Sequence, residues 1–109
     1  MAYLAPTASN GAGDVWVKIA EAGLDATGKT WAVDTLIKNR GKQEVTIPAG
    51  LASGKYLLRG ELIGLHEGEV AYTANEARGA QFYMECVQIN VVGTGTTVSF
   101  LDLVFKSYG

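Results

Sequence analysis

KYLLRGELIGL at residues 55–65 and AQFYMECVQINVV at residues 80–92 are the two segments that decide the fold. Each alternates its side chains with a period of two, which is typical of β-strands. In the first segment Tyr56, Leu58 and Leu62 share one face, while Leu57 and Ile63 lie on the other. Because both faces carry apolar residues, we expect this strand to lie centrally in its sheet.

Shorter segments around this pair predict the rest of the fold. Residues 14–20 (DVWVKIA) and 43–47 (QEVTI) alternate like strands, and residues 98–105 predict a last one. Residues 31–39 predict one or two helical turns, because Val33, Leu36 and Ile37 follow helical spacing. We therefore predict an all-β protein, a two-layer β-sandwich with one short helical turn. An immunoglobulin-like sandwich of this length normally has about seven strands or more, and fewer are visible here.

Composition bounds the class of protein. The chain has 109 residues, of which 48% are apolar and 18% charged, enough apolar surface for one folded domain. A net charge of −2 gives no support to binding of nucleic acid or of an anionic membrane. No apolar run reaches the roughly 20 residues of a membrane span. The first residues lack a signal-peptide pattern, which does not exclude secretion of a mature chain.

The chain has one cysteine, Cys86, and one histidine, His66. Together they are too few for a zinc site, which needs three or four protein ligands. We expect Cys86 to be a buried apolar residue, and the alternative is a half-cystine whose partner lies elsewhere. The two tryptophans, Trp16 and Trp31, are expected in the core.

Three polar side chains form the strongest candidate site. His66 follows the first long segment, and Gln81 and Tyr83 project from the same face of the second because they are two residues apart. If the two segments are neighbouring strands, the three side chains form one polar cluster. The plainer interpretation is a hydrogen-bonded histidine at a loop edge beside a half-exposed or internally satisfied Gln–Tyr pair.

Two alternative functions rest on other residues. Glu61, Glu67 and Glu85 are candidates for the paired carboxyl groups of a glycoside hydrolase, which we consider a weak endoglucanase hypothesis. Tyr72 and Tyr108 are the tyrosines expected to be exposed, and exposed rings bind the C–H faces of sugars. They predict a substrate surface, and on their own they favour a non-catalytic glucan-binding module.

Several segments together closely resemble one family. WAVDTLI at 31–37 is followed by VTIP at 45–48, GKYLLRGELIGLH at 54–66 and GAQFYMEC at 79–86. MAYLA at 1–5 and residues 16–21 are also similar. The likeness runs from about residue 1 to about residue 95. It is to the C-terminal half of the fungal lytic polysaccharide monooxygenases of auxiliary activity family 9, formerly glycoside hydrolase family 61.

The resemblance implies a function and roles for the cluster. Members of that family are secreted, copper-dependent enzymes that cleave β-1,4-glucans, chiefly cellulose, with a reductant and dioxygen or peroxide. Their copper is held by a brace of two histidines, one of them N-terminal, and by an axial tyrosine. Tyr83 matches that tyrosine. Gln81 and His66 match the pair that positions the oxygen species, and Cys86 matches a cysteine whose disulfide partner lies in the N-terminal half.

The departures from the family limit these expectations. Residue 1 is methionine, and His66 is the only histidine, so both brace histidines are missing from this sequence. Residues 98–109 do not resemble the family. The resemblance thus implies a truncated monooxygenase-like domain over residues 1–97, which is an all-β, partial immunoglobulin- or fibronectin-like β-sandwich with one short helical turn. It also implies a divergent tail over 98–109, and we expect the chain's own activity to be doubtful. Exposed sheet edges also suggest a homodimer.

Overall fold

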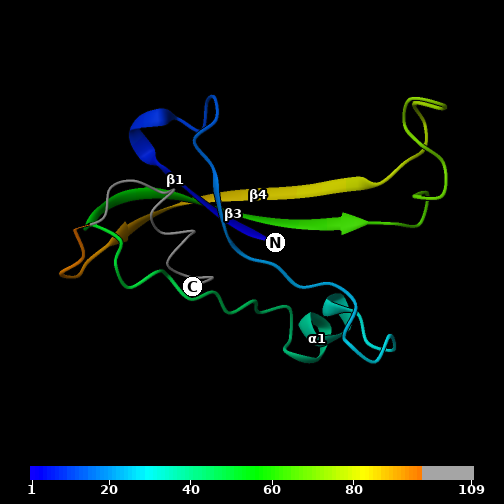
Figure 1. The fold of residues 1–109 in the computed structure, drawn as a ribbon, viewed down its shortest axis with the longest axis horizontal. Helices are drawn as coiled ribbons and strands as arrows, with labels where there is room; N and C mark the ends of the chain where they lie inside the picture. The colour runs from blue at the N-terminus through cyan, green and yellow to red at the C-terminus, as the bar shows by residue number, and fades with distance from the viewer. Residues whose placement is uncertain (97–109) are drawn as a thin grey trace.

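A computed structural model describes residues 1–96, and its centre is one antiparallel sheet of four strands in the order β2-β1-β3-β4 (Figure 1). The elements are β1 (Ala2–Pro6), the 3₁₀ helix η1 (Thr7–Ser9), β2 (Val17–Ala20), α1 (Ala32–Lys38), β3 (Gly54–Gly64) and β4 (Gln81–Val91). The all-β class with one short helix is thus confirmed. No helix among the described residues is long and apolar enough to cross a membrane.

The two long segments form the central hairpin. β3 and β4 pair without a register shift from Gly54 opposite Val91 to Gly64 opposite Gln81. β3 lies between β1 and β4, so its predicted central position is confirmed. Antiparallel pairing puts opposite residues on one face. Leu62 and Tyr83 therefore share a face with Gly64 and Gln81.

The first strand of the fold was not predicted. β1 pairs with β3 on one side and β2 on the other, and it buries Ala2, Leu4 and Ala5. The strand has only five residues, and they include two alanines and a proline, which are weak strand formers. Its position between two other strands outweighs that low propensity.

Two other strand predictions changed. Residues 42–48 contain no regular secondary structure, so the strand predicted over 43–47 is wrong, although Ile47 does pack against the core. The strand predicted over 14–20 begins at Val17. The strand predicted over 98–105 lies outside the described residues.

The helix α1 is fixed at both ends by local contacts. Asp34 accepts a hydrogen bond from the backbone N–H of Trp31, 3.0 Å away, at the N-terminus. At the C-terminus the N–H of Gly41 donates to the carbonyl of Leu36 at 2.9 Å, and Gly41 has φ +76°. Trp31 is 46% exposed, so its predicted place in the core is wrong: its backbone caps this helix instead.

The connection between β2 and α1 is ordered by Asp25. Its carboxylate accepts hydrogen bonds from the backbone N–H of Lys29 at 3.0 Å, from the hydroxyl of Thr27 at 2.8 Å and from the N–H of Thr30 at 3.3 Å. These bonds favour the ionised form and lower the pKa of Asp25 to about 2. They account for a compact turn in a segment rich in turn-forming residues.

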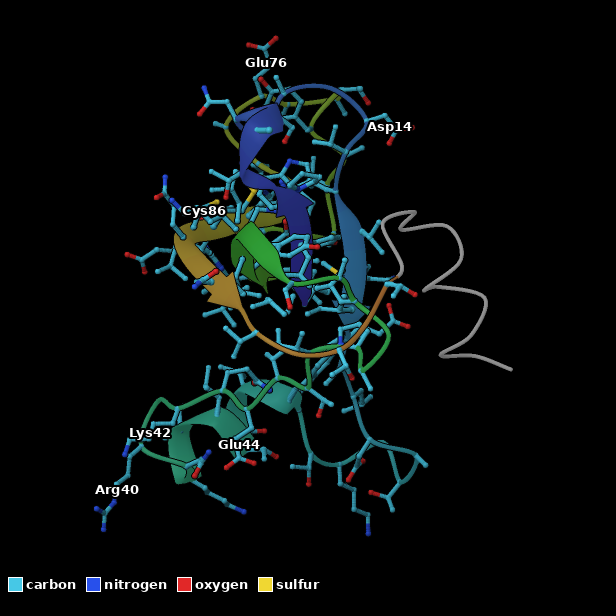
Figure 2. The ribbon with its side chains drawn as sticks, turned by 90° about the vertical axis from the view of Figure 1, so that its left-hand side faces the viewer. Asp14, Arg40, Lys42, Glu44, Glu76 and Cys86 are labelled. Carbon is cyan, nitrogen blue, oxygen red and sulfur yellow. The ribbon has the colours of Figure 1, made fainter. Side chains whose placement is uncertain are left out.

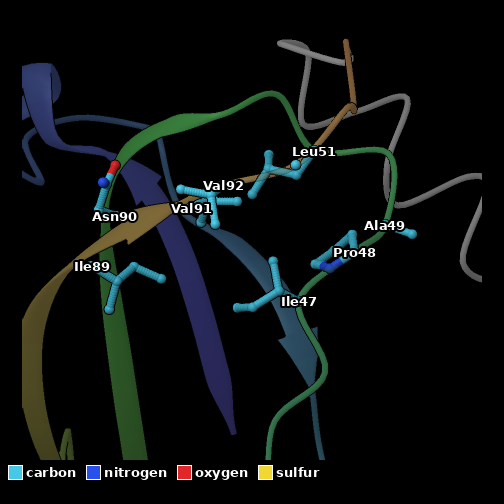
Figure 3. Close-up of a pocket in the computed structure, with 9 residues that line it drawn as sticks. Ile47, Pro48, Ala49, Leu51, Ile89, Asn90, Val91 and Val92 are labelled. Atoms are coloured by element: carbon cyan, nitrogen blue, oxygen red, sulfur yellow. The ribbon is translucent and has the colours of Figure 1, made fainter.

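The core lies at one end of the sheet, where β3 begins and β4 ends. Leu4, Leu51 and Tyr56 are buried there, and the residues packed around them are Ile19, Ile47, Leu58, Ile89 and Val91. Figure 3 shows Ile47, Leu51, Ile89 and Val91 beside an open apolar pocket. The other half of the hairpin is uncovered on both faces, with exposed side chains at Leu62, Ile63, Phe82, Tyr83, Met84 and Val87. This one-sided burial is consistent with part of a sandwich.

Candidate functional site

Two members of the predicted cluster are joined by a hydrogen bond. The hydroxyl of Tyr83 donates to the side-chain oxygen of Gln81, 2.6 Å away. Both side chains project from the same face at the start of β4, where alternation of the strand places them. The Tyr83 side chain is 55% exposed, so this face is open to a ligand. The structure thus brings Gln81 and Tyr83 together as expected.

The third member, His66, reaches the same place from the loop after β3. A side chain at Gly64 would place its Cβ 3.2 Å from both Cε1 and Nδ1 of His66, and 3.2 Å from Cε2 of Tyr83. The two rings therefore flank one glycine, and the cross-strand partner of that glycine is Gln81. His66, Gln81 and Tyr83 consequently meet at the open end of the hairpin. Their catalytic roles stay a prediction.

The loop over residues 65–80 carries His66 and is closed by Arg78. The Nε of Arg78 contacts Oε2 of Glu67 at 2.5 Å, and a second nitrogen pairs with Glu69. The N–H of Gly79 donates to the carbonyl of Glu67 at 2.9 Å. Gly79 is buried, with φ +109°, and its Cβ position lies 3.2 Å from Cβ of Tyr72. These contacts hold both ends of the loop beside the cluster, and they leave Tyr72 61% exposed.

Replacing Arg78 by glutamine is expected to loosen this loop without unfolding the sheet. The ion-paired side chains are 36–61% exposed, so their loss costs less than about 1 kcal/mol of stability. The amide proton of Gly79 should exchange faster with solvent, while the amides of β3 and β4 keep their rates. Hydrogen exchange measured by NMR checks this. The control is Lys18→Gln, which removes the ion pair with Glu21 outside the loop. Equal Gly79 exchange in the two variants would contradict the prediction.

The carboxylates of the hydrolase hypothesis are not arranged as a facing pair. Glu61 and Glu85 lie on opposite faces of the sheet, because Glu85 is opposite Gly60, the neighbour of Glu61. Glu61 is 9% exposed, and Glu67 is ion-paired with Arg78. A glycoside hydrolase needs two carboxyl groups across one bond. The geometry therefore gives that alternative no support.

The donors present do not fit a copper site by themselves. Within residues 1–96 no three His, Cys, Asp or Glu side chains are grouped to hold a metal ion. The amino group of Met1 donates a hydrogen bond to the carbonyl of Glu61 at 2.8 Å. The cluster offers one imidazole and one phenol, whereas copper is commonly held by several imidazole-type nitrogens.

Two residues of the site were missed, and one prediction about Cys86 was wrong. Gly64 lies within a predicted strand, and its contact with two rings depends on the strand register. Arg78 has no signal in the sequence pattern, because no periodic spacing links it to Glu67 and Glu69. Cys86 is exposed, not buried, because the face of β4 on which it lies is uncovered (Figure 2). Tyr108 lies outside the described residues.

The fold and the cluster define a class of protein: an all-β sheet protein with His, Gln and Tyr gathered where a long hairpin ends. Comparison with known proteins identifies the family. The model of Auxiliary Activity family 9 (formerly GH61) matches residues 1–108, and the chain belongs to that family.

Individual relatives agree with this assignment. The chain is 57% identical over 96 residues to an AA9 family lytic polysaccharide monooxygenase A of Aspergillus flavus, covering 88% of this chain and 24% of the relative. It is 49% identical over 94 residues to the monooxygenase A of Collariella virescens, covering 86% and 34%. This chain therefore spans about a quarter to a third of the length of these relatives.

Solved structures are similar as well. The structure named CvAA9A superposes with a TM-score of 0.83 at 46% identity, covering 89% of this chain and 44% of that chain. Cel61B from Hypocrea jecorina, a glycoside hydrolase family 61 member, gives a TM-score of 0.71 at 33% identity, covering 88% and 42%. The match thus extends over nearly all described residues and less than half of each solved chain.

Proposed function

We propose that this chain supplies one part of the active site of a lytic polysaccharide monooxygenase acting on cellulose or a related β-1,4-glucan. The observation that carries the proposal is the placement of the His66 and Tyr83 rings over Gly64, with the Tyr83 hydroxyl bound to Gln81. In a complete site Tyr83 would be one of the residues that hold the copper, which supplies the oxidative chemistry when bound. His66 and Gln81 would position the oxygen species by hydrogen bonds.

The nitrogen ligands that hold the copper would come from outside these 109 residues. The chain has one histidine, His66. The resemblance to the family assigns that histidine to positioning the oxygen species, not to holding the copper. Both faces of the hairpin around the cluster are exposed, as expected where further strands of a larger sandwich would pack. The chain alone should therefore lack brace-dependent activity. On the basis of the same family membership, we also propose that the protein is secreted and that its substrate is a glucan.

Copper titration followed by electron paramagnetic resonance tests this proposal. The chain alone should give no tight 1:1 type-2 copper signal with three nitrogen ligands, because it cannot supply them. Mixed with the part of CvAA9A that it does not match, it should give such a signal and release oxidised sugars from cellulose when a reductant is added. The matched control is the unmatched part of CvAA9A on its own.

Other results would change the conclusion. A three-nitrogen copper signal from the chain alone would show that the chain itself supplies the nitrogen ligands of copper. Depletion of the chain by microcrystalline cellulose without any oxidised product would favour the non-catalytic binding module, with Tyr72 as its exposed ring. Sugar release without copper or reductant would favour the hydrolase hypothesis.

A further inference from the structure

The strand β3 ends on a glycine that its backbone conformation does not require. Gly64 is the last residue of β3 and pairs with Gln81 of β4. It is not among the residues with a positive φ, the conformation that favours glycine. Glycine weakens a strand, and inside one it often marks a place where another group approaches closely. The space around Gly64 is therefore the reason to look for.

That space is taken by two rings. A Cβ at residue 64 would lie 3.2 Å from Cε1 and Nδ1 of His66, and 3.2 Å from Cε2 of Tyr83. An ordinary contact between non-bonded carbon atoms is longer, about 3.5–4.0 Å. A methyl group at this position would therefore push at least one of the two rings away by a few tenths of an ångström.

The two rings differ in how firmly they are held. Tyr83 belongs to β4, which pairs with β3 along its whole length, and its hydroxyl donates to Gln81 at 2.6 Å. His66 is exposed and lies in the loop that follows β3. Exposed side chains change rotamer readily, on the picosecond-to-nanosecond timescale. A side chain at residue 64 would therefore displace His66, because displacing Tyr83 would also break its bond with Gln81.

We propose that Gly64 is a positioning residue: its missing side chain lets the His66 ring lie beside the Tyr83 ring and sets the spacing of the cluster. This inference rests on the proposed function, in which His66, Gln81 and Tyr83 act together. It adds a size limit at residue 64. Any larger residue there would leave Tyr83 bound to Gln81 and would separate His66 from both.

Gly60 provides a matched control on the same strand. It lies four residues before Gly64 and therefore on the same face of β3. It also lacks a positive φ, and a Cβ at residue 60 would have no atom within 4 Å. The same substitution at the two glycines changes strand propensity alike. The two variants therefore differ in whether the new side chain meets the rings.

NMR of the chain alone tests the spacing, without copper or glucan. In the unmodified chain, the α-protons of Gly64 should show nuclear Overhauser effects to the rings of both His66 and Tyr83. Gly64→Ala should move the His66 ring signals more than those of Tyr83, while Gly60→Ala leaves both in place. Unchanged amide signals of β4 confirm that the sheet is kept. Overhauser effects to one ring only, or His66 signals that stay in place in Gly64→Ala, would overturn the proposal.

Activity of the mixture with the unmatched part of CvAA9A tests the consequence. Gly64→Val is used here, because its branched side chain displaces His66 further than a methyl group does. At saturating cellulose we expect roughly tenfold slower release of oxidised sugar, since a misplacement of about 1 Å can cost about a hundredfold. The cellulose concentration that gives half the maximal rate should stay the same, because Tyr72, the exposed ring of the proposed glucan surface, is unaltered.

Gly60→Val is the control for that measurement and should keep the rate of the unmodified mixture. Equal rates for Gly64→Val and Gly60→Val would overturn the positioning role of Gly64. An unmodified mixture without activity would instead contradict the proposed function. The NMR test would then still decide whether Gly64 sets the spacing of His66 and Tyr83, so the two failures are distinguishable.

Discussion

Replacing Leu4 by alanine should lower the free energy of unfolding by about 2–5 kcal/mol, the usual cost of emptying a fully buried leucine site. Leu4 is 0% exposed and lies in β1 opposite Leu58 of β3. It packs in the cluster with Leu51 and Tyr56, and it is the one large side chain among the described residues that is fully buried. Because typical domains are stable by only about 5–15 kcal/mol, this substitution removes a large share of the total.

Urea denaturation followed by circular dichroism measures that loss. The matched control is Leu62→Ala, the same substitution on the same face of the same sheet. Leu62 is 50% exposed, so it should lose well under half as much stability. Equal losses from the two variants would mean that the uncovered half of the hairpin is packed in solution. In that case the core would extend over the cluster.

Long-range pairing decided which strands could be predicted from the sequence. β3 and β4 each carry 11 residues of alternating side chains, so their period identifies them without any partner. β1 could not be found this way, because its strand character comes from lying between β2 and β3. Residues 43–47 show the reverse case: they alternate, but within residues 1–96 no neighbouring strand pairs with them, and they stay irregular.

In the candidate site, too, residues that follow a local pattern could be predicted, and residues that depend on long-range contacts could not. The spacing of Gln81 and Tyr83 predicts that they share a face, and the pairing of the two long strands predicts that His66 lies beside them. Arg78 and Gly64 depend on contacts across residues 65–80 and across the hairpin, which no local pattern encodes. Cys86 was misplaced because an apolar strand is usually covered on both faces. Here the face that carries it has no second layer in the described part of the chain.

Replacing Gln81 by leucine tests the cluster itself. In the mixture with the unmatched part of CvAA9A, we expect the variant to release about 10- to 100-fold less oxidised sugar. That is roughly the loss seen when a group that orients a metal ligand is removed. Leucine has similar size but cannot accept the hydrogen bond of the Tyr83 hydroxyl.

Gln88→Leu is the control: Gln88 lies on the same strand and on the opposite face, so activity should change little. The chain alone gives a second readout, because NMR signals of the Tyr83 and His66 rings should move in Gln81→Leu and stay in place in Gln88→Leu. If Gln81→Leu leaves both activity and ring signals unchanged, the hydrogen bond does not orient Tyr83. The prediction that Gln81 orients Tyr83 would then be wrong, even where the rings still meet over Gly64.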